Sequence, residues 1–148
     1  MLRVSKLTDY ATVVMTCLAV AGAEVVSAQQ LAEQAHLEVP TVSKLLKLLA
    51  HAGLVESRRG VNGGYFLARP AKEISVADII TAMEGPIGMT ECSVHSGLCN
   101  RESHCVVRVN WQRINLAIRT ALESVSLADM VATPPRQPMR IPLRMASA

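Results

Sequence analysis

Aromatic side chains are nearly absent from this chain. Its 148 residues include one Trp, two Tyr and one Phe, which together make up 3%. Half of the residues are still apolar, so a hydrophobic core must be built from Leu, Val, Ile and Ala. This composition favours helices over β-sandwiches and β-barrels. The length predicts one domain, or one small domain with an attached helix.

Segments of the length needed to span a bilayer are also lacking. The apolar stretch from Tyr10 to Ala23 follows Arg3 and Lys6, as in a signal peptide, but its apolar residues recur every three or four positions. That period predicts an amphipathic helix from about residue 5 to residue 21, ended by Gly22. We therefore expect a cytoplasmic protein with no membrane partner.

Acidic residues are scarce between Thr41 and Pro70, where one anion faces five cations. The formal charge of the whole chain is only +3, so these cations form a local basic patch. Such a patch on a nearly neutral protein suits nucleic acid better than a membrane surface, although charge alone leaves a solvated face as an equal alternative. The cations are Lys44, Lys47, Arg58, Arg59 and Arg69.

Signals for two short helices flank a tight turn in the first third of the chain. Ser27 is placed to cap a helix that runs to about Ala35. Pro40 is placed in the first turn of the next helix, where its missing N–H costs nothing, and that helix stops at Gly53. This order predicts a helix-turn-helix. The apolar residues of its second helix are predicted to be core, namely Val42, Leu45, Leu46, Leu48 and Leu49.

A glycine-rich turn follows the second helix. Residues 54–59 and 65–69 read as two strands around the turn at 60–64, which predicts a hairpin in the position of a wing. A nucleotide-binding loop is rejected because no GK[ST] follows and no helix opens there.

The N-terminal part of the second helix is predicted to enter the major groove of DNA. Arginines of the wing are expected to reach phosphates or the minor groove, and the wing glycines to let the backbone approach DNA closely. The candidate DNA-binding residues are Thr41, Ser43, Lys44, Lys47, Arg58, Arg59, Gly63 and Gly64.

Cysteine is rare, but three of the four cysteines stand together. Six residues separate Cys92 from Cys99, and five separate Cys99 from Cys105. Reduced cysteines clustered in this way indicate a metal or redox site rather than disulfides. The gaps exceed those of zinc knuckles, which favours an iron–sulfur centre in an irregular loop, with zinc or bare redox thiols as alternatives. Cys17 lies among apolar residues and is predicted to be a small buried hydrophobe.

A short helix, a long helix and a last short helical turn are also expected. Ser75 and Asp78 form the pattern of a capping box for a short helix through Met83, and Ser126 can cap a last short turn. After the third clustered cysteine, apolar residues alternate in steps of four and three, which predicts a long helix that packs on a copy of itself, or else on its own domain. These residues are Val107, Trp111, Ile114, Ile118, Ala121 and Val125.

The predicted fold is mainly α with a small β-hairpin wing. The pattern divides the chain into a winged helix-turn-helix DNA-binding domain over 1–83, a cluster-binding loop over 84–106, and a dimerisation helix with a short cap over 107–132. Residues 133–148 hold four prolines without periodicity, so a disordered tail is predicted.

Several motifs together resemble the winged-helix iron–sulfur regulators of the IscR/NsrR type. The resemblance covers about residues 1–130, and regulators of the SUF iron–sulfur assembly operon are the most similar members, through Glu84-Gly85-Pro86 and Thr90-Glu91-Cys92. The other matching features, besides the three-cysteine loop, are Leu7-Thr8-Asp9-Tyr10-Ala11, the stretch Pro40 to Leu46, Gly53-Leu54-Val55, Arg59-Gly60 and Gly63-Gly64-Tyr65.

The resemblance implies a homodimer on a partly palindromic double-stranded DNA operator, with a [2Fe–2S] or [4Fe–4S] cluster. It assigns Cys92, Cys99 and Cys105 as ligands. Some members add a histidine three residues after the last cysteine, where this chain has Arg108; others add an acidic residue from the first helix of the partner subunit, and Asp9 matches that position. Asp9 is therefore favoured as the fourth ligand. The alternatives are His95, Glu102 and His104.

The predicted function is a transcriptional repressor that senses iron–sulfur cluster status and controls cluster-assembly genes. A nitric-oxide or redox sensor of other genes is one alternative, and a zinc-stabilised DNA-binding dimer without sensing is another. An enzyme is rejected because the histidines near the cysteines form no recognisable triad or substrate pocket, so no small-molecule substrate is expected.

Overall fold

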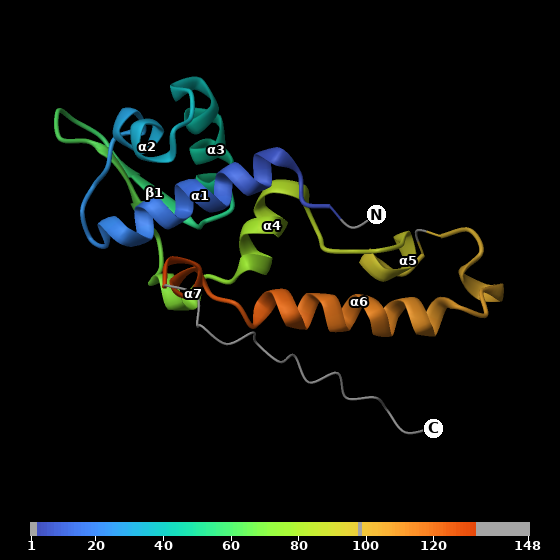
Figure 1. The fold of residues 1–148 in the computed structure, drawn as a ribbon. Helices are drawn as coiled ribbons and strands as arrows, with labels where there is room; N and C mark the ends of the chain where they lie inside the picture. The colour runs from blue at the N-terminus through green and yellow to red at the C-terminus, as the bar shows by residue number, and fades with distance from the viewer. Residues whose placement is uncertain (1–2, 98, 133–148) are drawn as a thin grey trace.

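The computed structural model describes residues 3–97 and 99–132 of the chain. The disordered tail predicted for 133–148 lies outside the described residues. Figure 1 shows the order of the elements, with the wing and two helices at one end and a long helix at the other. The prediction of a mainly helical chain with a two-stranded hairpin is confirmed.

Three helices form the first part of the chain. Helix α1 spans Lys6–Ala21 and ends at Gly22, whose φ is +64°. Helix α2 spans Ala28–Ala35 and begins with a complete capping box between Ser27 and Gln30. Helix α3 spans Val39–His51 and carries Pro40 in its first turn. The Ser27 capping box pairs backbone N–H groups that the helix itself leaves unpaired, whereas Pro40 has no N–H that would need a partner.

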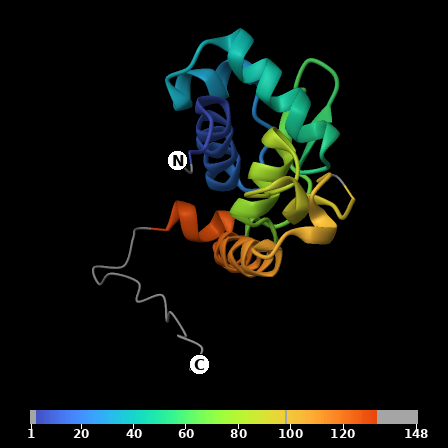
Figure 2. The same cartoon turned by 90° about the vertical axis from the view of Figure 1, so that its right-hand side faces the viewer.

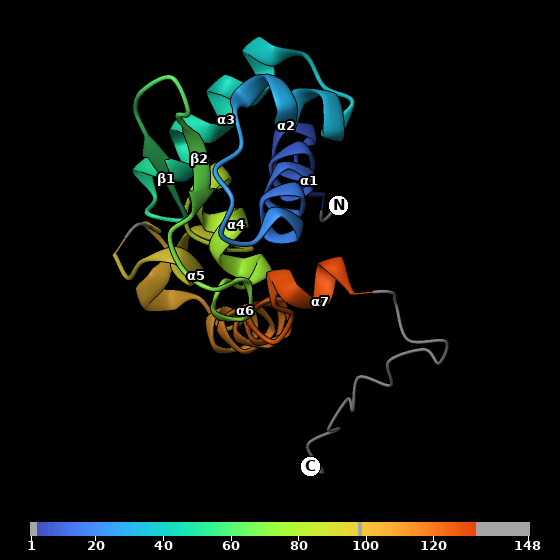
Figure 3. The ribbon, with the colours of Figure 1, turned by 90° about the vertical axis from the view of Figure 1, so that its left-hand side faces the viewer.

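The wing is a short antiparallel hairpin. Strand β1 covers Val55–Arg58 and strand β2 covers Gly64–Leu67, with Val55 opposite Leu67. Val26, just before α2, adds a bridge to Tyr65 through two backbone hydrogen bonds of 2.9 and 2.8 Å. Strand β1 also contacts α3, and Figure 3 shows the hairpin beside that helix. The hairpin is therefore attached on both sides to the helix-turn-helix.

The core is aliphatic, as the scarcity of aromatics requires. One predicted core residue is wrong, because Leu48 is 37% exposed. Helical geometry places Leu48 roughly 200° around the axis from the buried Leu46. The largest fully buried side chains are Met15, Leu18, Leu31, Leu45, Leu46, Leu49, Ile74, Ile79, Leu127, Val14, Val42 and Val55.

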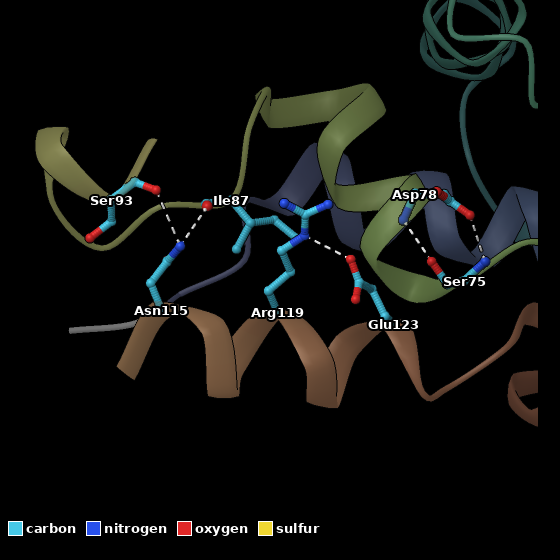
Figure 4. A network of polar contacts seen from close by, with 7 residues as sticks. All are labelled: Ser75, Asp78, Ile87, Ser93, Asn115, Arg119 and Glu123. Carbon is cyan, nitrogen blue, oxygen red and sulfur yellow. Dashed lines mark hydrogen bonds and ion pairs between the residues drawn. The ribbon is translucent and has the colours of Figure 1, made fainter. Parts of the chain in front are cut away.

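The middle of the chain leaves the wing through a short turn, η1, at Ala71–Glu73 and enters α4 at Val76–Glu84. Helix α4 begins with the predicted capping box: the N–H of Ser75 donates to Asp78 Oδ2 over 2.9 Å (Figure 4). The cysteine region is more regular than expected. It holds a short helix, α5, at Glu91–Val94, and a turn, η2, at Glu102–His104.

Helix α6 spans Arg108–Glu123, and a short helix, α7, follows at Leu127–Val131. In Figure 2, α6 is seen nearly end-on below α4. The chain then returns to the core. Leu127 is fully buried and its N–H donates to the Ile74 carbonyl over 2.7 Å. Both ends of the segment from α4 to α7 are therefore attached to the winged part.

None of the described helices is long and apolar enough to pass through a membrane.

Candidate DNA interface and cysteine region

The outer face of α3 presents two of the predicted DNA contacts. Lys44 and Lys47 are exposed, and neither forms an ion pair with another described residue. Thr41 and Ser43 are half-buried at the start of the same helix. The inner face of α3 is fixed by four fully buried aliphatic residues, so the lysines are held outward by the core. Those residues are Val42, Leu45, Leu46 and Leu49.

The wing arginines lie where β1 meets the turn. The guanidinium carbon of Arg58 stands 5.7 Å from the centre of the Phe66 ring, a cation–π arrangement that holds the side chain against the hairpin. Arg59 is exposed at the start of the turn. We call Lys44, Lys47, Arg58 and Arg59 the basic surface. The wing and α3 lie at the end of the molecule opposite α6 (Figures 1 and 3).

Arg69, the fifth cation of the basic stretch, has other contacts. It lies 3.8 Å from the carboxylate of Asp78 and donates to the Glu73 carbonyl over 3.4 Å. These contacts hold Arg69 at the base of α4, so it is not part of the basic surface.

The two wing glycines have a role inside the chain. A Cβ atom on Gly64 would lie 2.5 Å from the Val26 carbonyl oxygen, because Val26 pairs with the neighbouring Tyr65. A Cβ atom on Gly63 would lie 2.5 Å from the Arg58 carbonyl oxygen, inside the turn. The missing side chains are required for hairpin geometry, whether or not the backbone also approaches DNA.

The clustered cysteines are free thiols in different settings. Cys92 is buried on α5, where the Thr90 hydroxyl lies 3.2 Å from its sulfur. Cys99 and Cys105 are half-buried on either side of η2. Within the described part of the chain, no three Cys, His, Asp or Glu side chains are grouped as a metal site. The expected convergence of the three thiols is therefore not present in this conformation.

The candidates for a fourth ligand differ in their contacts. Asp9 is exposed in the first turn of α1. Glu102 is engaged within the loop: its carboxylate accepts from the Gly97 N–H over 2.5 Å and pairs with Arg108. His95 and His104 are exposed. The Glu102 side chain is only 13% exposed, and its contacts hold the loop together. The Asp9 carboxylate, in contrast, is exposed to solvent.

Cys17 is separate from this region. It is half-buried in α1 and packs against the core. Burial raises the pKa of the Cys17 thiol, which keeps it protonated and unreactive. Cys17 was predicted to be buried; it does pack against the core, but it is only half-buried.

Sequence reasoning missed two long-range polar contacts, one between α4 and the start of α1 and one in the cysteine region. Glu84, at the end of α4, accepts from the Ser5 N–H over 2.8 Å and from the Thr8 hydroxyl over 2.5 Å. These hydrogen bonds, the one from Thr8 first, lower the pKa of the Glu84 carboxyl. Asn115, buried on α6, contacts the backbone around α5. Neither position carries a local signal, because both contacts join residues far apart in the chain.

A helix-turn-helix followed directly by a hairpin wing, with exposed cations on both, defines a winged-helix DNA-binding protein. The family model for Rrf2, described as an iron-dependent transcriptional regulator, matches residues 4–133. The chain belongs to the Rrf2 family. It is accordingly a transcriptional regulator and not an enzyme.

Named relatives agree with this membership. The protein rrf2 of Nitratidesulfovibrio vulgaris is 32% identical over 123 residues, which is 82% of each chain. The HTH-type transcriptional regulator IscR of Cereibacter sphaeroides is 31% identical over 127 residues, again 82% of each chain. The resemblance to IscR-type regulators is thereby confirmed at the level of the family.

Solved structures show the same fold. CymR, the global cysteine regulator of B. subtilis, has a TM-score of 0.70 and 32% identity, covering 88% of this chain and 97% of that one. IscR of T. potens has a TM-score of 0.67 and 34% identity, covering 88% of this chain and 86% of that one. The chain therefore shares its fold with solved structures of two differently named regulators.

Proposed function

We propose that this regulator is a homodimeric repressor that senses iron–sulfur cluster status and controls cluster-assembly genes. Cys92, Cys99 and Cys105 would hold the cluster, with Asp9 of the partner subunit as fourth ligand. The observation that carries the proposal is the placement of three free thiols between α4 and α6, in a chain similar to IscR regulators over most of its length.

The basic surface supplies the contact with the operator. Lys44 and Lys47 lie on the exposed face of α3, near the helix end that a helix-turn-helix inserts into the major groove. Thr41 and Ser43 are placed at that end for bases or phosphates. The wing arginines then reach the flanking backbone or the minor groove. Lysine contacts with phosphates release counterions, so affinity should fall steeply with salt.

Dimerisation is supported by exposed apolar side chains on α6 and at Val107, the residue directly before it. Val107 is 46% exposed, Ile114 is 45% exposed and Trp111 is 36% exposed. These three belong to the predicted seam, and no other part of the described chain covers them fully. Val109 and Leu116, which are 65% and 64% exposed, lie on the opposite side of the helix and outside this seam. Exposed apolar side chains along one face of a helix mark an interaction site, and the four-and-three repeat of the seam suits a second copy.

The chemistry of the cysteine region fits the proposed cluster. Thiolates are the preferred protein ligands of iron–sulfur clusters, and three free thiols lie within one short segment. Arg108 stands in the position of the histidine used by some members and is paired with Glu102, which leaves an exposed carboxylate such as Asp9 as the available oxygen donor. When bound, the group would supply a centre that oxidants, nitric oxide or iron shortage can remove.

The chain itself provides the route from the thiols to DNA. Helix α5 contacts α6, α6 contacts α4, and α4 contacts both α1 and α3. A rearrangement of the cysteine region can thus change how α6 and the winged part sit in a dimer, and with it the spacing of two recognition helices.

A thiol-based redox or nitric-oxide sensor is the second candidate. The specific observation in its favour is the likeness to CymR of Staphylococcus aureus in an oxidised form, with a TM-score of 0.66 and 29% identity over 90% of this chain. A zinc-stabilised dimer uses the same thiols with no sensing role.

Anaerobic purification followed by iron and sulfide analysis tests the proposal. Iron and sulfide with visible charge-transfer absorption support it; zinc, or thiols without metal, support the alternatives. Operator affinity should differ between loaded and metal-free protein. Cys92→Ser should abolish that difference, whereas Cys17→Ser serves as the control and should keep it. Equal affinity in both states would contradict the proposal.

A further inference from the structure

Asn115 is unusual among the residues of α6. It is 8% exposed, and it and Thr8 are the buried polar residues of the described chain. The neighbours of Asn115 on α6 are exposed or half-buried, so this amide is the point at which the helix is most deeply covered. A buried amide is costly unless its hydrogen-bonding groups are paired.

All three recorded hydrogen bonds of the Asn115 side chain go to one short segment. Its Oδ1 accepts from the Met89 N–H over 3.2 Å. Its Nδ2 donates to the Ile87 carbonyl over 3.3 Å and to the Ser93 carbonyl over 3.4 Å, as Figure 4 shows. Cys92 lies between these partners, directly before Ser93. The Asn115 side chain therefore hydrogen-bonds to the backbone on both sides of Cys92.

The segment has little else to hold it. Cys92 is the buried hydrophobic residue that it contributes, and the main core cluster does not include it. A Cβ atom on Gly88 would lie 2.1 Å from a methyl carbon of Val94 on α5, so residues 87–89 and α5 lie in close contact. These two segments are joined to α6 by the Asn115 hydrogen bonds.

We propose that Asn115 is a positioning residue that fixes Cys92 and couples the cysteine region to α6. The significance of Cys92 as a ligand rests on the proposed function, but the positioning itself does not. An amide is required because the site uses one acceptor and two donors at once. Aspartate would set a carboxylate against two carbonyl oxygens, and leucine would fill the volume without any hydrogen bond.

The test measures access to Cys92 in reduced, metal-free protein. Cysteine-containing peptides are quantified by mass spectrometry after timed alkylation of the folded chain. A buried thiol reacts through local opening, so loss of about one net hydrogen bond in Asn115→Leu should raise the Cys92 rate on the order of tenfold. The rate at Cys17, which packs against the core of the winged part, should not change. Asn110→Leu, at an exposed position on the same helix, is the matched control.

Each outcome decides the inference. Faster labelling of Cys92 alone supports a positioning role. Equal acceleration at Cys92 and Cys17 would show a general loss of stability and overturn it, as would no change at either thiol. If Asn115→Leu does not fold, hydrogen exchange on the wild-type protein decides instead: the Met89 amide should be protected, and an unprotected Met89 amide overturns the inference.

A second arm separates this inference from the proposed function. If anaerobic protein carries a cluster, Asn115→Leu should lose its visible absorption several times faster in air than Asn110→Leu. Equal decay would overturn the coupling to the site. If wild-type protein carries no iron, the proposed function fails, while the alkylation result still decides the role of Asn115.

Discussion

The winged part and the cysteine region are stabilised in different ways. In the winged part, fully buried aliphatic side chains from α1, α2, α3 and α4 pack with Leu127 into one core. In the cysteine region, side-chain tethers to the backbone replace that packing: Asn115 at α5 and Glu102 at the Gly97 N–H. Helix α3 therefore rests on a packed core, whereas the cysteine region depends more on individual hydrogen bonds.

The free energies of side-chain burial and of hydrogen bonding support this contrast. Burying one Leu side chain stabilises a fold by about 1.5–3 kcal/mol, whereas a net hydrogen bond contributes about 0.5–1.5 kcal/mol. Eleven large side chains of the winged part are fully buried, and Leu127 of α7 packs with them. The cysteine region should therefore open locally at a free energy well below that of global unfolding.

The largest expected effect tests the core of the winged part. Leu46→Ala should destabilise the protein by about 2–5 kcal/mol, because it leaves a cavity beneath the recognition helix. Leu48→Ala, two residues later on the exposed face, should cost less than about 1 kcal/mol. Urea denaturation of both variants measures the difference. Equal losses would contradict the assignment of the two helix faces.

The second-largest expected effect concerns the attachment of the wing to the segment before α2. Gly64→Ala should cost about 1–3 kcal/mol, because the added Cβ meets the Val26 carbonyl oxygen at the bridge between the wing and the segment before α2. Asn62→Ala, exposed in the wing turn, is the control and should be nearly neutral. Thermal unfolding of the two variants measures the effect. A neutral Gly64→Ala would show that the wing is not held as tightly as the core.

The exposed charges should affect binding and not stability. Lys44→Ala combined with Lys47→Ala should weaken DNA binding and make the slope of log affinity against log salt shallower by about one for each phosphate contact removed. Lys72→Ala, a cation in η1 away from the basic surface, is the control. Fluorescence anisotropy at several salt concentrations gives the slopes. An unchanged slope would mean that another face contacts DNA.

The smallest effect concerns the junction between the two regions. The folded pKa of Glu84 lies below its ordinary value of 4.5, because Thr8 and Ser5 donate to the ionised carboxylate. The stabilisation is therefore present above pH 4.5 and is lost as the pH falls through the lowered value. Glu84→Gln should be less stable than wild type at neutral pH, with the gap closing in acid. Urea midpoints across that range show whether the gap closes; a gap independent of pH would refute the assignment.

Local signals in the sequence predicted the elements well. Ser27 and Ser75 marked helix starts that the structure confirms with complete capping boxes, and the glycine-rich turn marked the hairpin. Side-chain environment was harder to predict. Leu48 follows the apolar pattern but is exposed, and the short helix that carries Cys92 was expected to be irregular loop. The convergence of the three thiols is not present in the described conformation.

The long-range polar contacts of Glu84 and Asn115 could not be found from local patterns. The Thr8 hydrogen bond to Glu84 joins residues 76 positions apart, and the Asn115 hydrogen bond to Met89 joins residues 26 positions apart. A capping box or a helical period works within a few residues, so it carries no information about partners at such separations.

By itself, the sequence predicted the position of most helices and of both strands to within a few residues, and it showed which chemical groups are available: five cations between Thr41 and Pro70 and three clustered thiols. These depend on backbone capping, side-chain period and composition, which act locally. Only the tertiary structure decided that Leu127 enters the core, that Leu48 stays outside, and that Asn115 grips the segment around Cys92. Those outcomes depend on which distant surfaces meet, because burial and hydrogen-bond pairing are properties of the packed chain.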